Sequence, residues 1–240
     1  MSSSMRRHIR KAALTVATLA ALATQLPTHA ADFEVAPRFR DFYTHHQGIR
    51  VLGHPLSFEL PVQSWPSQYF EKGRIEDHSR ETTNTAWRFM YGRLTAEMMD
   101  KYPGAAVNNT NWTYRALRLQ NPKMNAAPAF QNGVQIQPDG RVFIPYDAKL
   151  QAAPGYYVPA NFWIYINRPD LFPGGWMHDV GLPLTDAVQA TTVKNGETRT
   201  IVLQAFERTV LTYDPKNPQE WQVERGNIGA DITTFPGGTK

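Results

Sequence analysis

The 240-residue sequence contains no cysteine. The chain therefore cannot form disulfides, which commonly stabilise small exported domains, and it offers neither a thiolate metal ligand nor a cysteine nucleophile. Its stability must come from a hydrophobic core, and at this length a sizeable core is expected. Beyond the first 30 residues, no apolar run approaches the roughly 20 residues that cross a membrane. We therefore expect no membrane span outside that segment.

Common catalytic motifs are missing as well. The sequence has no His-Glu-x-x-His zinc pair, no Gly-x-Ser-x-Gly turn, no lysine-containing phosphate loop and no dinucleotide glycine fingerprint. These absences favour a non-catalytic protein and predict no cofactor. They leave an enzyme open, because such motifs cover only the common mechanisms.

The first 30 residues have the order of a secretory signal peptide. Basic residues from Arg6 to Lys11 precede a short apolar run from Ala12 to Leu26, and small residues surround Ala30. This order predicts cleavage after Ala30. We therefore expect a secreted protein, either free outside the cell or held at the cell surface.

Removing this segment changes the charge balance. It contains four of the 25 Lys and Arg residues and no acid, which leaves 21 basic residues against 21 Asp and Glu. The exported chain then has a formal net charge of zero. It lacks the overall positive field that attracts nucleic acid or anionic lipid, so no nucleic-acid partner is expected.

One stretch occurs twice along the chain. Residues Gln68–Ile75 return in similar form as Gln204–Leu211, and a Gly-x-Pro-Leu turn precedes each copy, at Gly53–Ser57 and at Gly181–Thr185. Each copy is followed by a tryptophan and then, at the same spacing, by a glycine, namely Trp87 with Gly92 and Trp221 with Gly226. Such self-similarity indicates an internal repeat.

The repeat predicts a strand-dominated α+β fold. We expect this fold to contain two divergent helix–turn–β-hairpin repeats. The two repeats should pack together, because one such unit buries little surface alone. The predicted boundaries are a signal peptide (1–30), repeat 1 (31–101), an irregular connecting region with one β-hairpin (102–158) and repeat 2 (159–240). Repeat 1 should begin with a helix that starts at Pro37 and ends at Gly48, and repeat 2 with a helix after Pro159.

Alternating apolar and polar residues predict the strands. An Asn195-Gly196 turn between two such runs is typical of a tight hairpin, and the alternation places Phe70 and Phe206 inward. In the connecting region, a turn at Pro138–Gly140 predicts a further hairpin. Residues from Trp87 to Tyr91 are predicted to form the last strand of repeat 1.

Polar residues that recur in both copies favour a structural role. Ser57 corresponds to Thr185, so a hydroxyl is kept where its bond to a nearby backbone group can stabilise the turn. Glu71 corresponds to Glu207, and we expect both carboxylates to bond amides of the turn. A catalytic group is needed only once, whereas a contact that determines the fold is needed in every repeat.

The Leu52-Gly53-His54-Pro55 turn, the Gln68–Ile75 block and Tyr91-Gly92-Arg93-Leu94 together resemble the LGFP repeat of bacterial cell-wall-associated proteins. Repeat 2 is similar to it more loosely, and the chain from Ala31 resembles a group of uncharacterised secreted bacterial proteins with the same turn and hairpin. The usual aromatic of the motif is replaced by His54 and Leu182. The resemblance implies an exported, non-enzymatic module associated with the envelope or with extracellular glycan.

Tryptophans are the first candidate binding residues, since flat aromatic rings stack on sugars. Trp87 and Trp221 recur and are predicted to lie in the core. The other four are the candidates for a glycan-binding surface: Trp65, Trp112, Trp163 and Trp176.

A metal or acid/base site in repeat 1 is the second candidate. Its residues, which have no identical counterparts in repeat 2, are His46, His54, Asp77 and His78. Packing or surface roles are the commoner use of such histidines, so no metal is predicted outright.

Three functions follow, in order of preference. The first is an exported non-catalytic module that binds cell-envelope or extracellular glycan. The second is a secreted hydrolase, which requires that five side chains of repeat 1 converge in one cleft: His54, Glu71, Glu76, Asp77 and His78. The third is a structural subunit of a surface assembly, whose partner would be another envelope protein.

Overall fold

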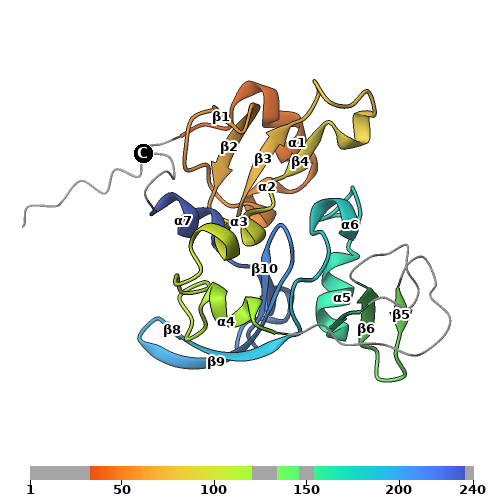
Figure 1. Ribbon diagram of the computed structural model, residues 1–240, viewed down its shortest axis with the longest axis vertical. Coiled ribbons are helices and arrows are strands. Elements are labelled where there is room, and N and C mark those ends of the chain that lie inside the picture. Colours follow the sequence, from red (N-terminus) through yellow and green to blue (C-terminus); the bar gives the residue numbers. More distant parts are fainter. Residues whose placement is uncertain (1–32, 121–133, 146–153, 236–240) are drawn as a thin grey trace, which may run out of the picture.

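The computed structural model describes residues 33–120, 134–145 and 154–235. The chain is an α+β protein that is rich in strands, as the sequence predicts at this level. Within the described residues, its strands form three antiparallel sheets. In Figure 1 the first sheet lies at the top, β8 and β9 of the second sheet lie at the bottom, and the small third sheet lies at the lower right. The predicted signal peptide lies outside the described residues.

The first sheet has four strands in sequence order: β1 (Leu60–Val62), β2 (Trp65–Phe70), β3 (Gly73–Asp77) and β4 (Phe89–Tyr91). Its central pair is the predicted hairpin, with Phe70 opposite Gly73 and only Glu71 and Lys72 in the turn. Phe70 is fully buried, as the alternation predicts.

The second sheet has the same order of neighbours: β8 (Val188–Lys194), β9 (Glu197–Ala205), β10 (Val210–Tyr213) and β11 (Val223–Arg225). Asn195 and Gly196 join β8 to β9 with φ values of 53° and 76°. Positive φ at both central residues is the favoured geometry of a two-residue hairpin, so the prediction here is confirmed. Phe206, at the end of β9, is fully buried.

The third sheet is small: β5 (Gln135–Ile136), β6 (Val142–Pro145) and β7 (Gly155–Val158). The predicted hairpin around Pro138–Gly140 forms β5 and β6, and Gly140 takes a φ of 82°. The described residues of the predicted connecting region, 102–120, 134–145 and 154–158, also contain the helix α4 and the strand β7.

Short helices connect and cover the sheets. They are α1 (Arg40–His45), α2 (Gly48–Val51), α3 (Leu94–Lys101), α4 (Tyr114–Arg118), α5 (Ala160–Ile166), α6 (Trp176–Asp179) and α7 (Ile228–Thr233), with 3-10 turns η1 (Pro37–Phe39), η2 (Thr85–Trp87) and η3 (Gln219–Trp221). No helix in the described part of the chain has the length and apolarity to cross a membrane.

Both four-stranded sheets are held to their glycine turn by the same contacts. Glu71 accepts from the amide of His54 at 3.1 Å, and Glu207 accepts from the amide of Leu182 at 3.2 Å. The hydroxyls also act as predicted: Ser57 Oγ accepts from the Tyr69 amide at 3.0 Å and Thr185 Oγ1 from the Ala205 amide at 3.1 Å. These polar side chains therefore stabilise the turns.

The glutamines of the two blocks are bound alike as well. Gln68 Nε2 donates to the Ser57 carbonyl at 2.9 Å, and Gln204 Nε2 donates to the Thr185 carbonyl at 2.7 Å. Both glutamines are fully buried. Each thereby satisfies backbone groups that would otherwise be buried without a partner.

The two sheets also contact each other reciprocally. Helix α3, which follows the first sheet, donates from the Ala96 amide to the Glu207 carbonyl at 3.4 Å. Helix α7, which follows the second sheet, donates from the Ala230 amide to the Glu71 carbonyl at 2.9 Å. Each sheet's hairpin turn is thus capped by the helix that follows the other sheet. Figure 1 shows α3 and α7 side by side between the first sheet and β9.

Residues from both sheets share one core. A single buried cluster contains Phe39, Phe70 and Tyr91 from the first half together with Phe162 and Phe206 from the second. A second cluster joins α3, α4 and α7 to the strands β8, β9 and β10. Because both clusters contain residues from distant parts of the chain, the halves depend on one another for burial.

Three predictions about local structure were wrong. Gly48 does not end the first helix: Gln47 takes the left-handed conformation, with φ of 47°, and Gly48 begins α2. Trp87 ends η2 before the last strand, which begins at Phe89. Trp87 and Trp221 do not lie in the core, since they are 40% and 39% exposed. Each instead packs against the short helix that precedes the other sheet's glycine turn, Trp87 against His178 of α6 and Trp221 against Arg50 of α2.

Candidate functional site

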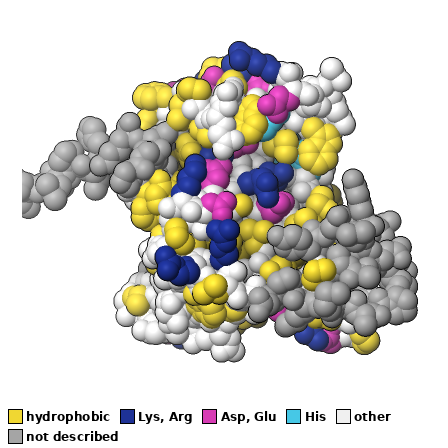
Figure 2. Space-filling model, in the orientation of Figure 1, with side chains coloured by type: hydrophobic (Ala, Val, Ile, Leu, Met, Phe, Trp, Pro, Cys, Tyr) yellow, Lys and Arg dark blue, Asp and Glu magenta, His cyan; other side chains and the backbone are white. Residues whose placement is uncertain are grey.

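A cavity of about 310 Å³ lies where the first sheet meets the hairpin turn of the second. We call it the Trp65 cavity. Its wall combines one aromatic ring with charged side chains from β3, from α3 and from the turn after β9, including Trp65, Arg74, Glu76, Glu97 and Arg208. Figure 2 shows acidic and basic side chains side by side in the middle of one face of the molecule.

The alternation of β3 explains which side chains face this cavity. Side chains two residues apart share a face of a strand. Arg74, Glu76 and His78 lie on the cavity side, whereas Ile75 lies in the core and Asp77 pairs with Arg38 at 2.6 Å. The strand therefore presents a cation, a carboxylate and an imidazole in a row.

Arg74 is the centre of the charged wall and is only 1% exposed. It donates from Nε to Glu76 at 2.7 Å, from Nη2 to Glu97 at 2.5 Å and from Nη1 to the Tyr69 hydroxyl at 2.9 Å. Burial alone lowers the pKa of Arg74, but the hydrogen bond and charge of Glu97 and the charge of Glu76 outweigh it and raise the pKa. The guanidinium therefore fixes both carboxylates in place.

His78 and Trp65 form the outer part of the wall. His78 Nε2 lies 3.0 Å from Glu76 and its Nδ1 lies 3.2 Å from Glu81. The indole of Trp65 packs on this imidazole, with centroids 4.3 Å apart, and donates from Nε1 to Glu81 at 2.6 Å. The ring of Trp65 is thereby held rigidly at the edge of the cavity.

Two more arginines line this cavity: Arg93 follows the first sheet, and Arg208 lies in the hairpin turn of the second sheet. Arg93 donates to Glu207 at 2.7 Å. Arg208 is 7% exposed and donates from Nη1 to the Tyr91 carbonyl at 2.5 Å, while its Nε has no partner among the described residues. Burial lowers the pKa of Arg208. The cavity therefore contains positive charge as well as carboxylates, and it can donate and accept hydrogen bonds.

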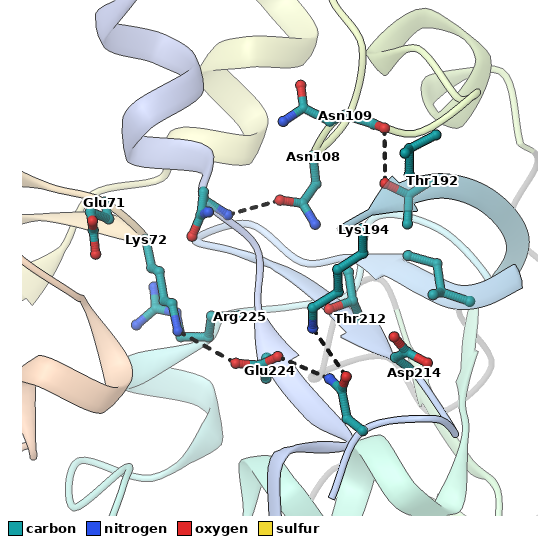
Figure 3. Close-up of a pocket in the computed structure, with 14 residues that line it drawn as sticks. Glu71, Lys72, Asn108, Asn109, Thr192, Lys194, Thr212, Asp214, Glu224 and Arg225 are labelled. Carbon is teal, nitrogen blue, oxygen red and sulfur yellow. Dashed lines mark hydrogen bonds and ion pairs between the residues drawn. The ribbon is translucent and has the colours of Figure 1, made fainter. Parts of the chain in front are cut away.

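A second cavity, of about 440 Å³, lies where the second sheet meets the hairpin turn of the first. We call it the inter-sheet cavity, and Figure 3 shows its lining. Lys72 enters it from the turn after β2, Thr212 and Glu224 from β10 and β11, and Asn108 and Asn109 from the loop between α3 and α4. This lining is polar and has no aromatic ring among the described residues.

The two cavities occupy corresponding places. Counted from Gln68 in one sheet and Gln204 in the other, the facing positions pair as Trp65 with Ile201, Glu76 with Thr212 and His78 with Asp214. The hairpin of the opposite sheet contributes Arg208 to the Trp65 cavity and Lys72 to the inter-sheet cavity. The scaffold residues recur, whereas the residues that line the cavities differ.

The four candidate tryptophans are all half-buried and lie in different places. Trp65 lines a cavity. Trp112 donates from Nε1 to the Gln189 carbonyl at 2.8 Å, which ties its loop to the second sheet. Trp163 and Trp176 pack edge to face, with centroids 5.6 Å apart, against the main core. The structure thus does not bring the four together into one surface.

The four candidate metal residues are not brought together either. His46 stacks on Phe42 at 3.8 Å, and burial lowers its pKa. His54 is exposed, Asp77 is bound to Arg38, and His78 faces the Trp65 cavity. Within the described ranges, no group of three or more His, Asp or Glu side chains is arranged to hold a metal ion.

Of the five side chains required by the hydrolase hypothesis, Glu76 and His78 meet in the Trp65 cavity. Glu71 bonds to the backbone of His54 at the glycine turn, and Asp77 points to the other face of β3. The cavity adds residues that were not predicted, above all Arg74, Glu97 and Arg208. Arg74 could have been identified because the matching position of the second block is Val210, whereas Arg208 corresponds to another cation, Lys72, and shows no such difference.

Comparison of the chain with protein-family models, curated proteins and solved structures finds no match. The two cavities are therefore the features of the molecule from which a function can be inferred. Both lie where residues from one sheet meet the turn of the other, and both have a size typical of sites for small molecules.

Proposed function

We propose that the chain is an exported, non-catalytic module that binds a glycan of the cell envelope or extracellular matrix in the Trp65 cavity. The observation that carries this proposal is the combination of a fixed indole ring with immobilised hydrogen-bonding groups. The ring supplies an apolar surface for one face of a sugar, and the charged wall supplies donors and acceptors for its hydroxyls. Arg74 preorganises this wall by holding Glu76 and Glu97.

We further propose that the two four-stranded units are divergent copies of one LGFP-like repeat. The support is the matching set of contacts at each glycine turn and the reciprocal capping of the hairpins by α3 and α7. Duplication also accounts for the corresponding cavities. One copy would have gained Trp65 and its neighbours for the ligand while the scaffold stayed the same.

Retention on insoluble cell-wall and polysaccharide fractions tests this function, with residues 31–240 as the protein. Trp65→Ala should weaken retention by about tenfold or more, equivalent to ~1.4 kcal/mol, because the stacking surface is removed. Trp87→Ala is the matched control: it removes an indole that is 40% exposed and lies outside the cavity, and it should leave retention unchanged.

Circular dichroism must show that both variants are folded. Equal retention of the two variants, or no retention of the unmodified protein on any fraction, would refute glycan binding in this cavity. Co-purification with another envelope protein in the absence of glycan retention would support the structural-subunit alternative. Retention that is lost when a chelator is added would instead support a metal site at the histidines of repeat 1.

The five side chains first required for a hydrolase do not converge, because His54, Glu71 and Asp77 lie outside the Trp65 cavity. Hydrolysis of the bound glycan is the second candidate in a form that needs only Glu76, His78 and Glu97, and one contact favours it. Glu76 lies 3.0 Å from His78 in a cavity that also holds Glu97, so acidic groups and an imidazole face the same space. The test is release of reducing ends from the retained polysaccharide. A hydrolase would release them and lose this activity in Glu97→Gln; a binding module would release none.

A further inference from the structure

Arg225 is a buried cation that forms no hydrogen bond or ion pair with an acidic side chain of the described residues. It is 2% exposed, and its nearest contacts are the Thr209 hydroxyl at 3.1 Å, the Arg208 carbonyl at 3.5 Å and the ring of Tyr91 at 4.8 Å. Its Nη1 has no hydrogen-bond partner in the described part of the chain. Burial of a charge is costly unless an opposite charge compensates for it. The charge of the buried Asp179 opposes the effect of burial on the pKa of Arg225, but no carboxylate of the described residues bonds the guanidinium. A carboxylate from a ligand is the group that would satisfy Nη1.

Lys72 lies beside Arg225 at the same end of the inter-sheet cavity (Figure 3). Its Nζ lies 3.4 Å from the Arg50 carbonyl and 3.9 Å from Glu224. The longer distance is an ion pair and not a hydrogen bond, so this ammonium keeps donors for another acceptor. Burial lowers the pKa of Lys72, and a bound anion would oppose that effect.

Neutral polar groups line the rest of the cavity. Asn108 and Asn109 stand in the left-handed conformation, with φ of 47° and 54°. Their loop is tied down because Asn108 Oδ1 accepts from the Asn227 amide at 3.0 Å and the Asn109 carbonyl accepts from Thr192 at 3.1 Å. Side-chain amides and hydroxyls on a fixed loop are well suited to the hydroxyls of a sugar.

The acids in the lining are already engaged. Asp214 is paired with Arg199 at 3.0 Å, Glu71 bonds to the His54 amide, and Glu224 accepts from Asn217 at 3.3 Å. None of them bonds the guanidinium of Arg225, whose Nη1 stays without a partner among the described residues. Ile201 occupies the place that Trp65 has in the other cavity, so stacking does not contribute to recognition here.

We propose that the inter-sheet cavity is a second binding site, for an acidic sugar whose carboxylate lies between Lys72 and Arg225 while its hydroxyls bond the asparagines. Its volume of about 440 Å³ is large enough for such a ligand. This site does not depend on the Trp65 cavity, because the two are lined by different residues.

Isothermal titration of residues 31–240 with D-glucuronate, D-glucose and acetate at constant ionic strength tests the proposal. Glucuronate should bind at least tenfold more tightly than either of the other two, because only glucuronate offers both the carboxylate and the hydroxyls. Equal binding of acetate would refute sugar recognition, and equal binding of glucose would refute the role of the cations. No heat with glucuronate would refute the site.

Two variants locate the carboxylate. Lys72→Met and Arg225→Met should each weaken glucuronate binding by at least tenfold. Arg225→Met also removes a buried charge, so it should not lower the thermal stability of the unliganded protein. Lys216→Met is the matched control, since this lysine is exposed and pairs with Glu197 outside the cavity.

Trp65→Ala should leave glucuronate binding unchanged, which separates this site from the Trp65 cavity. Unchanged affinity in Lys72→Met, or a loss in Lys216→Met as large as in Lys72→Met, would overturn the assignment.

Discussion

At the scale of single residues, Asp231 shows how the loop above the inter-sheet cavity is held. Its carboxylate lies on α7 and accepts from the amide of Asn108 at 3.3 Å. Burial raises the pKa of Asp231 to about 6, because the charged form loses water that it would have in the unfolded chain. The native protein thus binds a proton here more tightly than the unfolded protein does.

This difference makes stability depend on pH. Below the ordinary pKa of 3.8 the neutral acid stabilises the native state, and this contribution is lost as the pH rises through about 6. We predict that Asp231→Asn raises the free energy of unfolding by about 1–2 kcal/mol at pH 8 and changes it little at pH 3.5. Urea unfolding at both pH values measures the effect. The exposed Asp41→Asn is the control, and an equal gain at both pH values would contradict the prediction.

The sequence predicts the structural role of some polar residues but not the burial of others. The roles of Ser57 and Glu71 could be predicted because each has a counterpart at the matching position of the other copy. Arg208 and Arg225 could not, because a charged residue in or next to a strand ordinarily indicates a solvent-exposed face. They are buried because the other sheet covers them, and a sequence pattern within one strand does not contain that information.

At the scale of elements, the glycine turn before each hairpin is the most constrained feature. Gly53 and Gly181 have φ values of 75° and 82°, where side chains with a Cβ are strained. A Cβ at Gly181 would also lie 2.7 Å from the carboxylate of Glu207. Both the backbone angle and the close carboxylate therefore require glycine.

We predict that Gly181→Ala lowers the free energy of unfolding by about 2 kcal/mol, since it combines a left-handed alanine with a displaced Glu207. Gly104→Ala is the matched control: a Cβ there meets nothing within 4 Å, and no loss of stability is expected. Urea denaturation followed by tryptophan fluorescence gives both values. Similar losses in the two variants would contradict the role of the turn.

The elements themselves were predicted where a strong local pattern exists. The hairpins around Glu71-Lys72 and Asn195-Gly196 follow from alternation and turn residues. Strand β1 was missed because Pro61 lies at its centre, which is tolerated only on a sheet edge, and because its turn uses Gln63 and Ser64 at positive φ. Strand β7 was missed because it is short and depends on pairing with β6.

At the scale of the whole molecule, each cavity needs both halves of the chain. The first sheet forms the Trp65 cavity, but Arg208 comes from the second; the second sheet forms the inter-sheet cavity, but Lys72 comes from the first. The sequence predicted Trp65 for a glycan-binding surface, and Glu76 and His78 for a separate hydrolase cleft. Their common site could not be predicted, since it depends on how the halves pack.

That packing should make the protein unfold as one unit. At Gly229 of α7 an added Cβ would lie 1.8 Å from the carbonyl oxygen of Phe70 in the first sheet. A backbone carbonyl cannot rotate away as a flexible side chain can. Gly229→Ala must therefore displace α7 from the hairpin that it caps. We predict a loss of about 3 kcal/mol in the free energy of unfolding.

The loss should appear in a single transition. Because the two sheets share a core and cap each other, tryptophan fluorescence and far-ultraviolet circular dichroism should give the same lowered urea midpoint for Gly229→Ala. Thr234→Ala, an exposed change at the end of the same helix, should shift the midpoint little. Two separated transitions in Gly229→Ala would show that the halves fold independently. Cavities that need both halves would then form only when the halves are docked.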